Sequence, residues 1–321
     1  MNRVCDVLNI EKPIIQGPMA WISTAPLVAA VSNAGGLGVL GVGFAPHDFV
    51  ISQIEETKKL TDKPFGINTV IIPENLDGIT QIIKETQPPV IYADTLANLD
   101  YDLCKKYFDI WHEVGCKIVV KASFISDAIT AEKAGCDAIV IKGWEGGGHI
   151  TFEATTVLVP QAADQLSCPV IASGGIADGR GMAAMVALGA EGIEMGTIFM
   201  AAKETAVHPS VKDALIEAGD MSTVVTGYCT DEPCRQIKNK LSDQMIEIEN
   251  NNSKTEAAKQ FRGLAESSLK KAMMEGDMEN GAVMAGQVVS LIHEIKSVED
   301  IMNDVMNEAK DTLQKISQFE L

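Results

Sequence analysis

Short apolar runs rich in valine and isoleucine recur along the first part of the chain, and stretches with helical spacing separate them. The runs start about 20–32 residues apart, which is the length of one strand, one helix and two loops. There are eight of them, at residues 13–17, 37–43, 65–69, 90–93, 117–121, 137–142, 169–173 and 191–196. This order predicts an α/β protein whose parallel strands close into a (β/α)8 TIM barrel.

Helix boundaries between the runs support this strand count. Pro46 stands just before residues 49–60, where a proline suits the first positions of a helix. Gly115, Gly135 and Gly189 each precede a predicted strand by a few residues, and helix ends at such places favour a left-handed residue. Strand and helix signals therefore predict the same alternation.

The pattern changes after the eighth run, because the predicted strands stop and helical pieces rich in Asp, Glu and Lys follow. Residues 247–255 are the most loop-like stretch, and we expect them to be mobile. Residues 297–317 carry an apolar stripe at helical spacing, which predicts a packed helix. We expect the barrel to span residues 1–200 and a helical segment, 201–321, to cover the active site and return to the barrel around 284–321.

Charge and composition narrow the classes of partner. The 321 residues include 26 Lys and Arg against 44 Asp and Glu, a formal net charge of −18. Such a field repels nucleic acid phosphates and anionic lipid headgroups, so we expect no nucleic acid and no membrane partner. No apolar run reaches membrane-spanning length and the start lacks a signal-peptide layout, which predicts a soluble, cytoplasmic protein. The 7 cysteines lack paired C-x-x-C spacing and predict free thiols without a metal site.

Glycine-rich loops follow the seventh and eighth predicted strands. In a (β/α)8 barrel the active site lies at the C-terminal strand ends, and these two loops commonly hold a phosphate. The first loop begins Ser173, Gly174, Gly175 and the second begins Gly196, Thr197. Glycines let backbone N–H groups approach a phosphate closely, so the loops predict a phosphate-bearing ligand. The alternative is that these glycines only form tight turns.

Three other strand ends predict a flat ring beside that phosphate. Met19 follows the first strand among small residues, Asn68 lies in the third and Lys121 ends the fifth. Small residues and Met suit a flat apolar ring, while Asn68 and Lys121 could address its polar edge. A phosphate beside a flat ring describes FMN. Lys121 could instead belong to a structural ion pair, because a barrel interior tolerates an unpaired cation poorly.

His149 is the candidate catalytic residue, because of the five histidines it alone lies on a loop over the predicted site. Three glycines, residues 146–148, precede it, and we expect them to make this loop mobile enough to bring the ring onto a substrate. An imidazole there suits general acid–base catalysis near neutral pH. The alternative is a histidine that only shapes the pocket.

Seven motifs spread over essentially the whole chain carry a family resemblance, at residues 15–21, 32–38, 61–68, 146–150, 172–181, 195–197 and 284–287. They resemble the FMN-dependent barrel flavoproteins that include nitronate monooxygenases (2-nitropropane dioxygenases) and the flavin-type enoyl-acyl-carrier-protein reductase II. The resemblance makes His149 the active-site histidine. It also implies an FMN site built from Met19, Asn68, Lys121, Ser173, Gly174, Gly175, Gly196, Thr197, Met284, Gly286 and Gln287.

The resemblance leaves the reaction open between two branches. Residues 235–241, 276–277 and 283–287 are more similar to enoyl reductase II. That branch implies an oxidoreductase of fatty acid synthesis in which NADH or NADPH reduces FMN, a trans-2-enoyl thioester takes the hydride, and His149 helps to protonate its α-carbon. Lys121 is more similar to the monooxygenase branch, in which a nitronate reduces the flavin and O2 reoxidises it. A flavin-binding protein without catalysis is a third alternative.

Three stretches depart from both branches near the expected substrate and nicotinamide side. Residues 92–96 replace a glycine-rich turn, Ile198 replaces an arginine, and residues 229–233 replace a histidine-bearing stretch. These departures leave the reaction and the use of NAD(P)H open.

Two expectations concern macromolecular partners. An acyl carrier protein is acidic, so docking on this acidic chain would need a local basic patch, for which Arg235, Lys238 and Lys240 are the candidates. A solvated helix face is the alternative meaning of that cluster. We also expect a homodimer.

Overall fold

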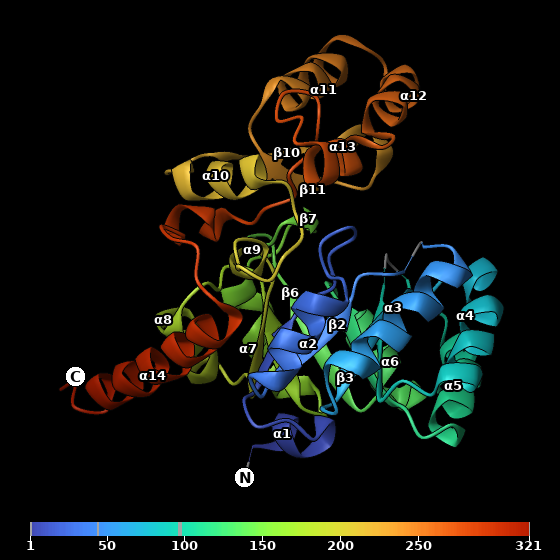
Figure 1. Ribbon diagram of the computed structural model, residues 1–321, viewed down its shortest axis with the longest axis vertical. Helices are drawn as coiled ribbons and strands as arrows, with labels where there is room; N and C mark the ends of the chain where they lie inside the picture. The colour runs from blue at the N-terminus through green and yellow to red at the C-terminus, as the bar shows by residue number, and fades with distance from the viewer. Residues whose placement is uncertain (1, 44, 96–97, 321) are drawn as a thin grey trace.

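The computed structural model describes residues 2–43, 45–95 and 98–320. Eight parallel strands close into a barrel with helices around it (Figure 1). All eight predicted strands, and with them the TIM barrel, are confirmed. In barrel order they are β1 (Ile14–Gln16), β2 (Leu37–Leu40), β3 (Phe65–Val70), β4 (Val90–Asp94), β5 (Lys117–Ala122), β6 (Ala138–Lys142), β8 (Val170–Ser173) and β9 (Gly192–Met195).

The helices between these strands begin and end where the sequence signals indicate. α3 begins directly after Pro46, and Gly115, Gly135 and Gly189 have φ angles of 95°, 107° and 105°. Only glycine adopts this left-handed backbone without strain, so each lets the chain turn from a helix into a strand. These helices are α2 (Ala25–Asn33), α3 (His47–Leu60), α4 (Pro73–Thr86), α5 (Tyr101–Glu113), α6 (Ile125–Ala134), α7 (Thr155–Gln165) and α8 (Gly179–Ala187).

Two apolar cores hold the barrel, one inside it and one outside. On β6, Ala138 and Val140 belong to the inner core, while Ile139 and Ile141 pack outward against the helices. This alternation follows from the two-residue period of a strand. The short helix α1 (Arg3–Leu8) packs its apolar side chains against the inner core, so the N-terminal end of the barrel is closed.

Residues after β9 form a mixed lobe rather than the purely helical segment we expected. Two strands, β10 and β11, pair with β7 (Gly148–His149) in a second, antiparallel sheet, so the prediction that strands stop after the barrel is wrong. Figure 1 shows this lobe stacked on one end of the barrel. Its elements are α9 (Thr197–Met200), α10 (Pro209–Glu217), β10 (Thr223–Thr226), the 3-10 helix η1 (Tyr228–Thr230), β11 (Cys234–Ile237), α11 (Lys240–Asn251), α12 (Lys254–Ala265) and α13 (Ser268–Glu275).

The end of the chain returns to the barrel. After the 3-10 helix η2 (Gln287–Leu291), helix α14 (Val298–Ile316) packs against α8 and α2, which confirms the helix predicted from the apolar stripe. The expected mobile stretch at 247–255 is a wrong prediction, because α11 runs to Asn251 and α12 begins at Lys254. In the described part of the chain, no helix has both the length and the apolar character to cross a membrane.

Candidate active site

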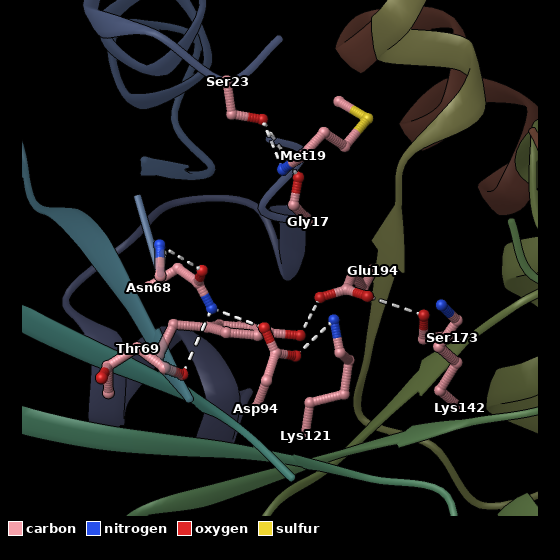
Figure 2. A network of polar contacts seen from close by, with 12 residues as sticks. Gly17, Met19, Ser23, Asn68, Thr69, Asp94, Lys121, Lys142, Ser173 and Glu194 are labelled. Atoms are coloured by element: carbon pink, nitrogen blue, oxygen red, sulfur yellow. Dashed lines mark hydrogen bonds and ion pairs between the residues drawn. The ribbon is translucent and has the colours of Figure 1, made fainter. Parts of the chain in front are cut away.

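Six barrel strands end in an inward-pointing polar side chain. In each strand the polar residue lies two positions after an inward-facing residue. Its side chain therefore also points inward, at the C-terminal mouth of the barrel (Figure 2). Lys121 and Asp94 keep 17% and 20% of their side chains exposed, so this mouth is open to solvent. We call the six side chains the mouth ring: Asn68, Asp94, Lys121, Lys142, Ser173 and Glu194.

The part of the mouth ring on β3, β4 and β5 is linked by an ion pair and a hydrogen bond between its own side chains. We call this part the closed arc. The Nζ of Lys121 lies 2.6 Å from Oδ1 of Asp94, and the Asn68 amide donates to the other oxygen of the same carboxylate. Asn68 Oδ1 in turn accepts from the N–H of Gly43 at 3.0 Å. Burial alone would lower the pKa of Lys121, but Asp94 and Glu194 outweigh it and raise the pKa above its ordinary value. The ion pair we considered for Lys121 is therefore present.

The part of the mouth ring on β6, β8 and β9, which we call the open arc, contains a second carboxylate. Glu194 accepts hydrogen bonds from the hydroxyl of Tyr92 and from Ser173 Oγ, the latter at 2.7 Å. Burial, followed by the charges of Glu194 and Asp94, raises the pKa of Tyr92 well above its usual range. A Cβ on Gly17 would lie 2.9 Å from the Glu194 carboxyl carbon, so the glycine leaves the space that this carboxylate occupies.

Lys142 has no such partner. Its Nζ donates to the backbone oxygen of Gly147 at 2.7 Å, and no carboxylate of the described residues lies within ion-pair distance of it. Figure 2 accordingly draws no contact from Lys142 to another side chain of the mouth ring. Desolvation and the positive charge of Lys121 lower the pKa of Lys142 to about 8.

His149 lies on β7 (Gly148–His149), which pairs with β11 of the lobe opposite Cys234. The side chain is exposed, yet the surrounding protein and then the charge of Lys142 lower its pKa. Two of the preceding glycines allow close packing, whereas Gly148 has a φ angle of 70° and open space around it. A Cβ on Gly146 would lie 2.6 Å from Cε of Lys142, and one on Gly147 would lie 2.7 Å from the Ala285 backbone.

The predicted phosphate loops lie side by side, because β8 and β9 are neighbours in the barrel. Gly174 and Gly175 have φ angles of 95° and 76°, which a side chain would strain. Among the described residues, the N–H groups of Gly174, Gly175 and Gly196 have no hydrogen-bond acceptor. Three free donors on two adjoining loops fit a phosphate, and they therefore fit the phosphate end of a flavin nucleotide.

The segment that the resemblance implies at the site, residues 284–287, makes contacts with two neighbouring loops. The N–H of Gly286 donates to Thr197 Oγ1 at 2.9 Å, and the N–H of Gln287 donates to the backbone oxygen of Glu145 at 2.9 Å. Both lie between the phosphate loops and the loop of His149. Met284 instead packs against the apolar core of the lobe.

One prediction beside the site concerns the basic docking patch for an acyl carrier protein. Arg235 is only 4% exposed, since its guanidinium donates to the backbone oxygen of Trp144 and lies over that ring. It is therefore wrong as part of a docking surface, whereas Lys238 and Lys240 are exposed. Of the departing stretch at 92–96, Asp94 belongs to the mouth ring and residue 96 lies outside the described residues.

The sequence interpretation missed Lys142, Glu194, Tyr92 and the role of Asp94. Lys142 ends the sixth run just as Lys121 ends the fifth, so the same argument about an inward cation at a strand end would have found it. Predicting Glu194 and Asp94 as site residues requires knowing which face of the strand points inward, as well as where the strand lies. The opposite register would place both side chains under the outer helices.

Comparisons with known proteins identify the family of this chain. The sequence profile described as nitronate monooxygenase matches residues 1–89 and 104–308. A Staphylococcus aureus relative named "Probable nitronate monooxygenase" is 32% identical over 356 residues, covering 98% of both chains. The solved structure of FabK from Thermotoga maritima is 40% identical, with a TM-score of 0.92 over 99% of this chain and 98% of FabK. A nitroalkane oxidase from Streptomyces ansochromogenes, at 24% identity and a TM-score of 0.83, shares the fold.

The profile covers most of the chain, and the relatives align over nearly their full length. The closed barrel is thus shared with these relatives along nearly the whole chain. The chain is a flavoprotein oxidoreductase that belongs to the nitronate monooxygenase family.

Proposed function

We propose that this protein is an FMN-dependent reductase of trans-2-enoyl thioesters that takes its electrons from NADH or NADPH. The observation that carries the proposal is the placement of His149 above a polar barrel mouth, next to two loops with free N–H donors. The similarity to FabK, an enoyl-acyl-carrier-protein reductase, supports this branch because its identity of 40% exceeds the 32% of the monooxygenase relative.

The residues of this chain would hold FMN at two ends. Gly174, Gly175 and Gly196 would donate to its phosphate, with the hydroxyls of Ser173 and Thr197 nearby. Met19, Asn68 and Lys121 would lie at the ring, while Gly286 and Gln287 would close the site from the lobe side. When bound, FMN would supply hydride transfer from a nicotinamide to the β-carbon of the thioester.

His149 would complete the reduction by moving a proton at the α-carbon. β7 fixes its backbone through the pairing with β11, so the imidazole has a defined place above the mouth. Its lowered pKa makes the protonated ring a stronger acid than a free histidine. Orientation of the substrate against this ring then contributes through proximity.

Exposed aromatic side chains on the same end of the barrel fit an apolar substrate chain. Trp21 follows β1 and Phe124 follows β5, with exposures of 47% and 44%. Phe152 lies between Trp144 and Tyr228, its ring centroid 6.0 Å and 6.3 Å from theirs. An acyl chain or the arm that carries it would cover such surface, and its burial would favour binding.

Two observations favour a second candidate, a nitronate monooxygenase. Lys142 offers an ammonium group without a carboxylate partner to an anionic nitronate. The lowered pKa of His149 also leaves its ring neutral, and therefore able to accept a proton, at and above neutral pH. The name of the Staphylococcus aureus relative fits this candidate as well.

An anaerobic titration tests the two candidates against each other. NADH is added to the oxidised flavoprotein, and the visible flavin absorbance is followed before and after addition of a crotonyl thioester. The proposal expects NADH to bleach the flavin and the thioester to restore its colour. If NADH leaves the flavin oxidised and a nitronate bleaches it, the reductase assignment is wrong.

The pH dependence of turnover provides an independent test, because the two reactions need opposite protonation states of His149. As a proton donor, His149 must be protonated, so the reductase rate falls as pH rises through its pKa, which lies below the ordinary value. As a base toward a neutral nitroalkane, it must be neutral, so that rate rises through the same pH range.

A further inference from the structure

We propose that Lys142 is a positioning residue for His149: its ammonium group ties the His149 loop to the barrel mouth, and its positive charge beside that loop makes the imidazolium a stronger proton donor. The inference rests on the role given to His149 above. It assigns a function to the one cation of the mouth ring that has no carboxylate partner among the described residues.

The tie is visible in the contacts of the loop that joins β6 to β7. Lys142 ends β6, and its Nζ holds the backbone oxygen of Gly147, two residues before His149. The lysine stem lies directly under the loop, because a Cβ on Gly146 would come within 2.6 Å of its Cε. Segment 285–286 presses on the other side of the same glycines, so the loop is clamped between the lysine and the lobe.

Backbone pairing with β11 holds Gly148 and His149, and other contacts fix the start of this loop. The N–H of Gly143 donates to the backbone oxygen of Ser173, and Glu145 accepts from the N–H and hydroxyl of Thr155. These bonds lie four or more residues before His149. Among the described side chains, Lys142 makes the hydrogen bond closest to His149 along this loop. Its loss would therefore loosen the segment that carries the imidazole.

Charged groups on four elements face His149. Desolvation disfavours the imidazolium most, and Lys142 on β6 and Lys121 on β5 disfavour it further. Glu232 of the turn before β11 and Asp94 on β4 favour it. Lys121 is compensated by its own contact with Asp94. Cys234, opposite His149 on β11, stays a neutral thiol, because burial raises its pKa to about 12.

The charge state of Lys142 itself depends on its neighbours. Desolvation and Lys121 disfavour its ammonium form, while the carboxylates of Glu194 and Asp94 favour it. With a pKa of about 8, Lys142 is still mostly charged at the lower pH where His149 titrates. The lysine can therefore repel a proton from the imidazole over the whole range in which that proton would bind.

The experiment measures the titration of His149 by NMR in the flavin-loaded protein, with His149→Ala to assign the signal. In Lys142→Met we expect the midpoint to rise by about 0.5 to 1 pH unit, since the nearest like charge is gone. In Lys142→Arg, which keeps the charge, we expect the midpoint to stay near that of the wild type. Lys240→Met, which removes an exposed lysine, is the matched control and should leave the midpoint unchanged.

Amide hydrogen exchange across residues 146–149 tests the tie separately, with faster exchange expected in Lys142→Met. Neither readout needs turnover, so the result stands whether or not an enoyl thioester is the substrate. An unchanged His149 midpoint in Lys142→Met, or an equal rise in Lys142→Arg, would overturn the charge assignment. If Lys142→Met does not fold, the comparison of Lys142→Arg with Lys142→Gln gives the same decision.

Discussion

Each arc of the mouth ring contains one lysine and one carboxylate, but the two arcs pair these groups differently. In the arc of Asn68, Asp94 and Lys121, the lysine and the carboxylate neutralise each other and the amide is bonded on both sides. In the arc of Lys142 and Glu194, the carboxylate is bonded to hydroxyl groups and the lysine is left with a backbone oxygen. The first arc therefore holds the barrel together, whereas the second holds a loop that carries chemistry.

This difference follows from what each arc faces. The loops that carry Gly174, Gly196 and His149 do not follow the strands of the closed arc. The open arc borders both phosphate loops and the loop of His149. An unpaired ammonium group costs stability, and natural proteins keep such groups mainly at functional sites. Variants in each arc should therefore fail in different ways.

The largest effect is expected from His149→Ala on the side of the open arc. Removing a general acid typically costs about 100-fold or more in turnover, so kcat for a crotonyl thioester should fall by at least that factor. The flavin content should not change, because the phosphate loops do not depend on this side chain. His293→Ala, at an exposed histidine outside the site, is the control. Steady-state rates together with the flavin absorbance of the purified variant check both statements.

The next largest effect belongs to the closed arc and concerns stability. Lys121→Met leaves Asp94 without its cation, and we expect the free energy of unfolding to fall by about 2 kcal/mol. Adding Asp94→Asn removes the stranded charge, so the double variant should recover at least half of that loss. Urea unfolding of the two single variants and the double variant measures the coupling. Strictly additive losses would mean that the pair does not stabilise the barrel.

The sequence predicts the features that depend on a local pattern better than those that depend on contacts between distant residues. The barrel strands were predictable because each is buried on both faces and forms a short apolar run between helices. Lys121 was predictable as an inward cation for the same reason. β10 and β11 were not, since each is only four residues long and Thr223–Thr226 is only partly buried.

Long-range pairing explains the remaining errors. β7 is a strand only because Cys234 and Arg235 lie opposite it, and these residues are far away in the sequence. The same pairing buries Arg235 against Trp144 and removes it from the surface. Residues 247–251 are polar and look like a loop, yet a capping box at Asn239 and the burial of Leu241 and Met245 hold them in α11.

A smaller effect on stability is expected from Lys142, and its sign should be opposite to that of Lys121. Lys142→Met removes an unpaired cation at the cost of one hydrogen bond, so the free energy of unfolding near pH 7 should rise by about 1 kcal/mol. The comparison of the arcs breaks if Lys142→Met is as destabilising as Lys121→Met. Urea unfolding of both variants in one buffer decides this.

The advantage of Lys142→Met should disappear at higher pH. The pKa of Lys142 is about 8 in the folded protein and 10.5 when unperturbed, so the unfolded chain binds more protons between these values. Within that window the stability of the wild type rises with pH relative to a variant that lacks the lysine. Below pH 8 the lysine is charged in both states, and the difference between wild type and variant should be constant. Urea unfolding of the wild type and Lys142→Met at pH 7 and pH 9.5 measures this change. A stability advantage of the variant that grows at pH 9.5 would contradict the prediction.

The smallest effect is expected outside both arcs, where an acyl carrier would dock. Lys238 directly follows β11, the strand that pairs with β7, and it is exposed like Lys240. Replacing both by glutamate should raise KM for an enoyl-acyl-carrier substrate about threefold, because an acidic carrier loses attraction that is screened at the surface. KM for the small, uncharged crotonyl-N-acetylcysteamine should not change. The matched control is Lys310→Glu with Lys315→Glu on α14, which changes the net charge equally on exposed positions of a helix that packs beside the barrel. An equal rise in KM for both pairs would mean that net charge, rather than a dock beside β11, governs the encounter.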